Sequence, residues 1–293
     1  MRRALKWAAY GVGGALVLVL FAVAALYGRG TLILEKKWDV AGIDIPVPSD
    51  SASIAHGQHI AKSRGCLGCH NELAQGHVFF DEPGIARIVA PNIARLARQY
   101  STVEFERVVR HGVRPDGMGV AIMPSEMFAS LSDADVGSVI AYLRSLTPVK
   151  DSFPPREVRF MGRIGLATGK FNLAPQLIQR SRIDRAAPAP GDTIALGRYV
   201  AQTSCTECHG MDLRGASVED VATPNLVVAA AYSREQFTHL MRTGEPVSGR
   251  KLGLMAQAAT ERFAHFTDEE VAALHSYLKT LTKAPLQLST SSK

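Results

Sequence analysis

The 293-residue chain is long enough for two domains, and its 46% hydrophobic and 20% charged residues are typical of a globular protein with one very apolar segment. Its formal net charge of +6 is not spread evenly, because the basic excess lies at the N-terminus and between residues 147 and 191. This distribution excludes an extended basic face for nucleic acid and favours contacts with a membrane surface.

The N-terminus predicts a membrane anchor. An uncharged, apolar run extends from Trp7 to Gly28, behind three basic residues. A helix needs about 20 residues to cross a bilayer. A cleaved signal peptide ending near Ala22-Val23-Ala24 is the alternative, but the run is longer than a signal core. We therefore predict a single uncleaved anchor over residues 1–30 in the inner (cytoplasmic) membrane. The basic N-terminus then places the rest of the chain on the periplasmic side.

The motif Cys-x-x-Cys-His occurs twice, as Cys66-Leu67-Gly68-Cys69-His70 and as Cys205-Thr206-Glu207-Cys208-His209, and it contains every cysteine of the chain. Two thiols at this spacing can add across the two vinyl groups of one porphyrin, and the histidine is then held beneath the iron. A zinc site would leave both histidines unexplained, and a redox dithiol seldom recurs with a histidine each time. The motifs therefore predict two covalently bound haem c groups and an oxidising, extracytoplasmic compartment.

Four further segments follow the anchor. We predict an extended, proline-bearing spacer over residues 31–50, a first haem domain over 51–147, a linker over 148–191 and a second haem domain over 192–293. In the first domain a helix capped by Ser51 or Ser53 leads to the first motif, and a loop-rich stretch follows it. Helices capped by Ser101 and Ser132 come next, the former ending at Gly112.

The second domain repeats the first. Pro91-Asn92 recurs as Pro224-Asn225, and the helix end at Gly112 recurs at Gly244, so the two halves can be compared position by position. The repeat also selects the ligand opposite each histidine. Met118, Met123 and Met127 are candidates in the first domain, but only Met123 has a counterpart.

Met123 follows Gly112 by the same number of positions that separate Met255 from Gly244. We therefore predict His70 with Met123 and His209 with Met255 as the axial ligands of two haem irons. Met255 lacks the proline that follows Met123. The rival ligands, none of which recurs in the repeat, are His56, His59, His77, His111, His239, His265 and His275.

The linker combines prolines, scattered apolar residues and eight basic residues. This mixture suits packing between the two haem domains or contact with an anionic membrane surface. We favour packing between the domains, because the apolar pattern is irregular.

In both halves the order of these motifs resembles the class I cytochrome c family, over about residues 51–147 and 192–284. The resemblance implies an all-α fold in which the first and last helices of each domain cross beside the haem. It implies His70 and His209 as proximal ligands and Met123 and Met255 as distal ones. It also implies that the carbonyl groups of Pro91 and Pro224 support the two histidines. The arrangement is similar to membrane-associated cytochrome subunits that serve periplasmic dehydrogenases.

The favoured function is one-electron transfer between a periplasmic donor, such as a dehydrogenase, and a respiratory acceptor, with no catalytic residues in this chain. One alternative is a dihaem peroxidase with an open site at the second haem, where the methionine loop is less regular. The other is a membrane-tethered subunit whose role is to dock a dehydrogenase.

Overall fold

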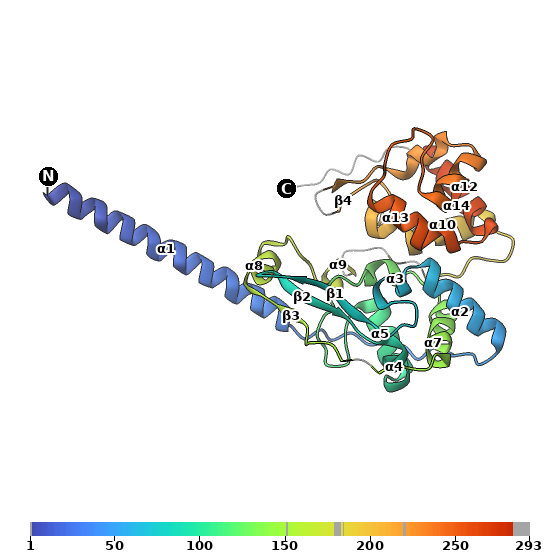
Figure 1. The fold of residues 1–293 in the computed structure, drawn as a ribbon, viewed down its shortest axis with the longest axis horizontal. Coiled ribbons are helices and arrows are strands. Elements are labelled where there is room, and N and C mark those ends of the chain that lie inside the picture. Colours follow the sequence, from blue (N-terminus) through green and yellow to red (C-terminus); the bar gives the residue numbers. More distant parts are fainter. Residues whose placement is uncertain (1, 151, 179–182, 184, 219–220, 284–293) are drawn as a thin grey trace.

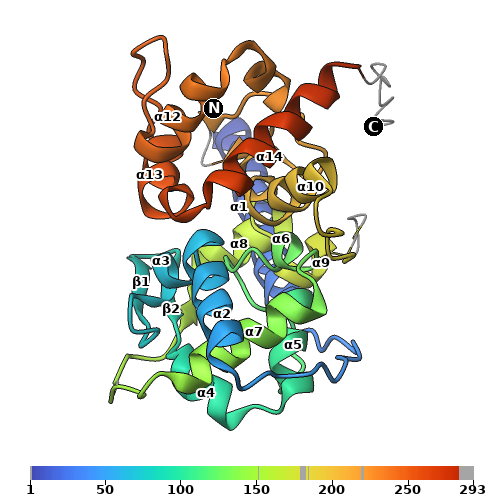
Figure 2. The same cartoon turned by 90° about the vertical axis from the view of Figure 1, so that its right-hand side faces the viewer.

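The computed structural model describes residues 2–150, 152–178, 183, 185–218 and 221–283. A long helix, α1 (Arg2–Glu35), projects away from two mainly helical domains, and the second domain lies over the first (Figures 1 and 2). The fold is all-α with a few short strands, as the resemblance to class I cytochromes c implies.

The apolar helix is longer than the run that predicted it. It reaches Glu35, and its most apolar window has a mean hydropathy of 2.3 with none of that window buried, so by length and composition it can cross a membrane. Its last turns are packed. Gly30 is buried against α8 (Phe160–Thr168). A Cβ at this position would lie 2.0 Å from the carbonyl oxygen of Arg163, so the two helices are in backbone contact here. The Tyr27 and Phe160 rings stack with centroids 5.7 Å apart, which ties α1 to α8.

The first domain is built on two crossing helices, α2 (Ser51–Ser63) and α7 (Asp133–Ser145). The helices approach to backbone contact at Gly57, where a Cβ would lie 1.9 Å from the carbonyl oxygen of Ser138. The N-cap of α2 is Asp50, whose carboxylate accepts from the Ser53 N–H at 2.9 Å. The predicted caps, Ser51 or Ser53, were therefore wrong, because the cap lies one residue before Ser51 and three before Ser53. The caps of the next helices are as predicted, with Ser101 and Ser132 before α5 and α7.

The remaining helices of this domain surround the crossing pair, and they are α3 (Cys66–His70), α4 (Ile93–Gln99), α5 (Thr102–His111) and α6 (Ser125–Phe128). A three-stranded antiparallel sheet adds an element that the sequence reading missed. Its strands are β1 (His77–Glu82), β2 (Ala86–Ala90) and β3 (Glu157–Val158), in the order β1-β2-β3. The hairpin occupies the stretch that we expected to be loop.

The second domain repeats this plan with α10 (Thr193–Ser204) crossing α14 (Asp268–Thr280). Gly197 is the contact point, because a Cβ there would lie 2.0 Å from the carbonyl oxygen of Ala273. The other elements are α11 (Thr206–His209), β4 (Ser217–Val218), β5 (Val221–Ala222), η1 (Leu226–Ala231), α12 (Arg234–Thr243), α13 (Leu254–Glu261), η2 (Phe263–His265) and η3 (Leu281–Lys283).

The described part of the linker does not pack between the haem domains as we favoured. β3 pairs with β2, α8 packs on α1, and α9 (Ala174–Ile178) packs on α5 and α6. The linker thus joins the first domain to the base of the anchor. The spacer is extended as predicted but closely packed. Trp38 is buried, and its backbone N–H donates to the Gly117 carbonyl at 2.9 Å.

Polar side chains connect the two domains directly. Arg64, only 2% exposed, ends α2 and donates to Thr203 Oγ1 and to Glu270 Oε1, each at 3.1 Å. Glu270 also contacts His59 Nε2 at 2.9 Å. Burial alone would raise the pKa of Glu270, but the His59 hydrogen bond and the Arg64 charge lower it from 4.5 to about 2. The Glu270 carboxylate of the second domain is therefore held charged by Arg64 and by its hydrogen bond with His59, both of the first domain.

A second contact lies beside it. The Tyr199 hydroxyl, on α10, donates to the Asp135 carboxylate of α7 and accepts from the Ser132 N–H at 2.9 Å. All three groups are buried, so the bonds are made away from water. The relative placement of the domains is thus fixed by side chains that are satisfied only when both domains are present.

We predict that Gly57→Ala destabilises the protein by about 2–3 kcal/mol, because the added methyl meets backbone that cannot move aside. Ala55→Ser, on the exposed face of the same helix, is the control and should change the free energy of unfolding by less than about 0.5 kcal/mol. Denaturant unfolding of the holoprotein measures both. Equal stabilities of the two variants would show that α2 and α7 do not meet at Gly57.

We also predict an acid-sensitive domain contact. The pKa of Glu270 is lower in the folded chain than its ordinary 4.5, so its contribution to stability is complete above pH 4.5 and is lost as the pH falls toward 2. Glu270→Gln should therefore be clearly less stable than the wild type at pH 7, and the difference should shrink below pH 4.5. Denaturation midpoints of both proteins across that range measure this, and a difference independent of pH would contradict it.

Candidate haem-binding sites

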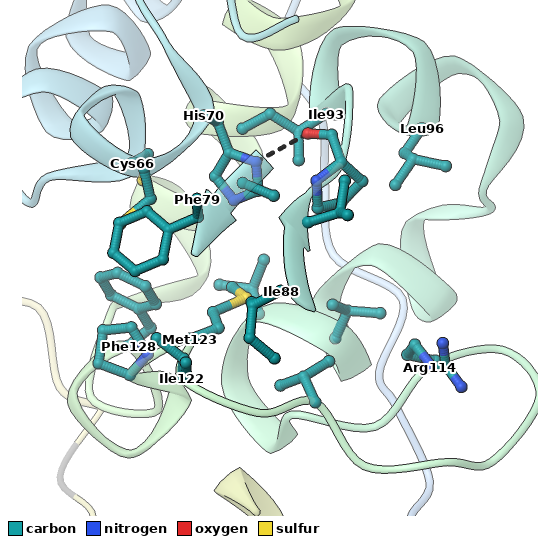
Figure 3. A pocket seen from close by; sticks show the side chains of 18 of the residues that line it. Cys66, His70, Phe79, Ile88, Ile93, Leu96, Arg114, Ile122, Met123 and Phe128 are labelled. Carbon is teal, nitrogen blue, oxygen red and sulfur yellow. Dashed lines mark hydrogen bonds between the residues drawn. The ribbon is translucent and has the colours of Figure 1, made fainter. Parts of the chain in front are cut away.

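A cavity of about 600 Å³ lies in the first domain, between α3, the sheet and α5. Its walls are mostly apolar, which excludes water from whatever is bound there. Cys66, Cys69 and His70 lie on one side and Met123 on another (Figure 3). The volume is in the range of sites for cofactors and other small molecules. The residues that the sequence predicted for the first haem are therefore gathered around one space that can hold a flat, apolar group.

The orientation of His70 suits a metal ligand. Its Nδ1 lies 2.8 Å from the Pro91 carbonyl oxygen. A carbonyl can only accept, so Nδ1 carries the proton and Nε2 keeps the free lone pair that iron would take. Burial lowers the pKa of His70, which also favours the neutral ring. The hydrogen bond implied by the family resemblance is thus present.

The three candidate methionines are in different places. Met123 lines the cavity, and its sulfur points into it in Figure 3. Met127 is fully buried in the hydrophobic core of the domain. The backbone of Met118 forms an isolated antiparallel β-bridge with Lys37. The geometry therefore favours Met123 over the other two. None of the seven rival histidines is among the residues that line this cavity. Three of them are engaged elsewhere, His56 with Asp135, His59 with Glu270 and His275 with the Tyr232 carbonyl.

The second motif repeats the arrangement of the first. His209 Nδ1 lies 2.8 Å from the Pro224 carbonyl oxygen, although Pro224 follows its histidine at a shorter interval than Pro91 does. Thr223 ties this shorter loop to the motif, because its hydroxyl donates to the Cys208 carbonyl at 2.7 Å. Cys205 belongs to the apolar core of the second domain, and half-buried Met255 packs against the same core.

Met255 differs from Met123 in its backbone setting. Met123 precedes Pro124 in a loop, whereas Met255 is the second residue of α13. A helical position gives its side chain less freedom than a loop does, so the position of this sulfur is set by how α13 packs on the domain.

The thiols do not behave like a redox dithiol. No disulfide joins any of the four cysteines, and burial raises the pKa of Cys66 to about 11 and of Cys205 to about 12. Thiols of such high pKa are poor nucleophiles and poor metal ligands near neutral pH. In addition, the described residues contain no group of three or more His, Cys, Asp or Glu side chains able to hold a metal ion. Covalent attachment of a porphyrin remains the interpretation that gives both cysteines and the histidine of each motif a role.

The two attachment motifs meet at the domain interface, which the sequence did not predict. Arg262 of the second domain lines the first cavity beside Gly65 and Cys69. Its Nη1 bonds at 2.5 Å to Glu207, a residue inside the second motif. Gly65 has a φ of 81°, and a Cβ there would lie 2.5 Å from Arg262 Nε. Arg262 thus touches both motifs, and only a residue without a side chain fits at position 65.

The crossing helices, the Cys-x-x-Cys-His turns and the histidines held by proline carbonyls define a c-type cytochrome. The chain belongs to the cytochrome c family, whose family model (Cytochrome c) matches residues 54–147 and 194–282.

Several curated proteins are similar to this chain. The fructose dehydrogenase cytochrome subunit of Gluconobacter japonicus is 24% identical over 80% of this chain and 54% of the relative. The alcohol dehydrogenase (quinone) cytochrome c subunit of Gluconobacter oxydans is 24% identical, with coverages of 81% and 56%. The gluconate 2-dehydrogenase cytochrome c subunit of Pantoea cypripedii is 22% identical, with coverages of 80% and 60%. The chain therefore spans little more than half the length of these relatives.

We predict that Met123→Ala leaves both haems attached, because the thioether bonds do not involve this residue. It should remove about half of the near-infrared methionine-to-iron absorption and lower one midpoint potential, since the thioether favours ferrous iron. Met118→Ala, which removes a methionine from outside the cavity, is the matched control and should leave the spectrum unchanged. An unchanged spectrum in Met123→Ala would show that another group is the ligand.

Proposed function

We propose that this protein is a membrane-anchored dihaem cytochrome that carries electrons, one at a time, from a periplasmic dehydrogenase to a respiratory acceptor. The observation that carries the proposal is the meeting of the two attachment motifs at one domain interface, where half-buried Arg262 bonds to Glu207 of the second motif and lines the first cavity beside Cys69. A relay needs its two centres close together and fixed. Two unrelated binding domains on one chain would have no reason to bury their motifs against each other.

The proposed roles follow from the positions of the residues. Cys66 and Cys69 bind one porphyrin covalently, and Cys205 and Cys208 bind the other. His70 and His209 present Nε2 to the iron because the Pro91 and Pro224 carbonyls hold Nδ1. Met123 and Met255 are the proposed opposite ligands. When bound, the haems supply reversible one-electron chemistry between ferric and ferrous iron.

The surrounding protein restricts the haems to electron transfer. Apolar walls exclude water, and two protein ligands on each iron leave no position for a small molecule, so oxygen or peroxide chemistry is suppressed. The rigid interface limits rearrangement when the charge changes. This is why we prefer a carrier to a peroxidase, in which one iron would need an open position.

The partner and the membrane location are supported by different observations. The similar proteins are cytochrome subunits of dehydrogenases for fructose, alcohol and gluconate, which supports a dehydrogenase as the donor here. The apolar α1 supports an anchor in the inner membrane, with both haem domains in the periplasm. Docking of a dehydrogenase and electron transfer are then two parts of one role.

We predict that mild-detergent purification of the tagged full-length chain from native membranes retains a dehydrogenase, and that the purified chain contains two haems by pyridine haemochrome assay. Addition of the dehydrogenase's substrate should reduce both haems. A high-spin haem with peroxide turnover, and no reduction by any retained partner, would favour the peroxidase. A chain without residues 1–30 tests the anchor, because it should be found in the soluble fraction.

A further inference from the structure

The linker contributes a wall to the first haem cavity. Residues Ser152 to Arg156 lie beyond the part of the chain that matches the cytochrome c family, yet all five line the cavity. They are held there because β3 pairs with β2 directly after them, through Arg87 and Glu157. The same segment leads into α8, which packs on the anchor helix. One wall of the first cavity is therefore a strap from outside the part of the chain that matches the cytochrome c family.

Two guanidinium groups face the cavity where this strap meets the loop after α5. Arg156 comes from the strap and Arg114 from the loop, and both line the cavity. Arg114 pairs with Asp116 at 2.8 Å, but its Nε is buried and has no hydrogen-bond partner among the described residues. Arg156 lines the cavity but is an exposed residue, and it makes no ion pair or hydrogen bond with any described residue. Partial burial and the Arg114 charge lower the pKa of Arg156.

This is an unfavourable arrangement in the absence of an anion. Two like charges that line one apolar cavity repel each other, and only one of them, Arg114, is paired with a carboxylate. Guanidinium groups bind carboxylates in bidentate geometry, so the chemistry of this corner calls for one or two carboxylates arriving from inside the cavity.

The covalent chemistry of haem puts its carboxylates at this place. The vinyl groups that react with cysteines are on one edge of the porphyrin, and the two propionates are on the opposite edge. Cys66 stands at one end of the cavity and Arg114 at the other (Figure 3). A porphyrin bonded at Cys66 and Cys69 therefore directs its propionates toward Arg114 and away from the second domain. Tyr100, which also lines the cavity, adds a hydroxyl near Arg114.

We propose that Arg156 of the linker, together with Arg114, binds the propionates of the first haem and thereby raises its midpoint potential. The inference rests on the proposed dihaem function. It adds that a residue from outside the cytochrome domain, in the segment fixed to the membrane anchor, is a positioning residue for the haem. A nearby positive charge disfavours the ferric state, which carries one more positive charge than the ferrous state, so the pair favours reduction of the first haem.

The test is a spectroelectrochemical titration of the full-length holoprotein, in which each haem gives a one-electron wave. The wave that shifts in Met123→His marks the first haem, because a second histidine lowers its potential. Arg156→Gln should move this wave to lower potential, with about a tenfold increase in the oxidised-to-reduced ratio at a fixed potential, or about 59 mV. The other wave should stay. Arg156→Lys should leave this wave close to its wild-type potential, since lysine keeps the positive charge.

Arg87→Gln is the matched control. It removes an arginine of the neighbouring strand whose side chain pairs with Asp81 at 2.8 Å instead of lining the cavity. It should leave both waves in place. Arg114→Gln should act in the same direction as Arg156→Gln, and if it does not assemble, the Arg156 pair of variants decides.

Two outcomes are distinguishable. Two haems per chain with an unmoved first wave in Arg156→Gln would overturn the propionate assignment and leave the dihaem carrier intact. Fewer than two haems per wild-type chain would overturn the proposed function itself. An equal shift of both waves would also contradict the inference, because it would indicate a general charge effect.

Discussion

The buried charge of Arg64 is the constraint on which the arrangement of the two domains depends. A guanidinium that is almost wholly removed from water is tolerable only if its donors are satisfied, and the partners here are Thr203 and Glu270 of the other domain. Neither domain can slide along the other without breaking these bonds while the Arg64 charge stays buried. Since Arg64 stands two residues before Cys66, the constraint acts directly at the first attachment site.

Much of the site could be predicted from the sequence because it depends on local spacing. The Cys-x-x-Cys-His turns, the helix caps at Ser101 and Ser132, and the glycine ends of α5 and α12 are short-range features, and they recur in both halves. Comparison of the halves also singled out Met123, which the structure places in the cavity wall. The repeat is informative because it preserves an interval that core methionines have no reason to keep.

The remaining features depend on contacts between distant segments. The β1–β2 hairpin was taken for a loop, although Pro83-Gly84 lies between two runs of alternating side chains that could have indicated it. Arg262 and Arg156 could not be predicted, because each acts on a cavity built by residues far away in the chain. The same holds for Gly65, whose lack of a side chain matters only once the second domain is in place. Contacts between domains produce no periodic pattern of residues in the sequence, so they cannot be predicted from it as helices and strands can.

The close contact at Gly30 has a consequence for how the protein meets its partners. Because α1 continues as one helix into its packed contact with α8, the apolar segment is joined to the first domain through continuous helix. A cytochrome on a loose tether could rotate to meet a donor from any direction and wait for rare productive encounters. This chain, anchored through α1 as proposed, would keep a constant tilt relative to the bilayer, so redox partners would have to approach in the membrane plane or from a single face. Recognition is thus partly decided by the orientation of one helix before any surface contact is made.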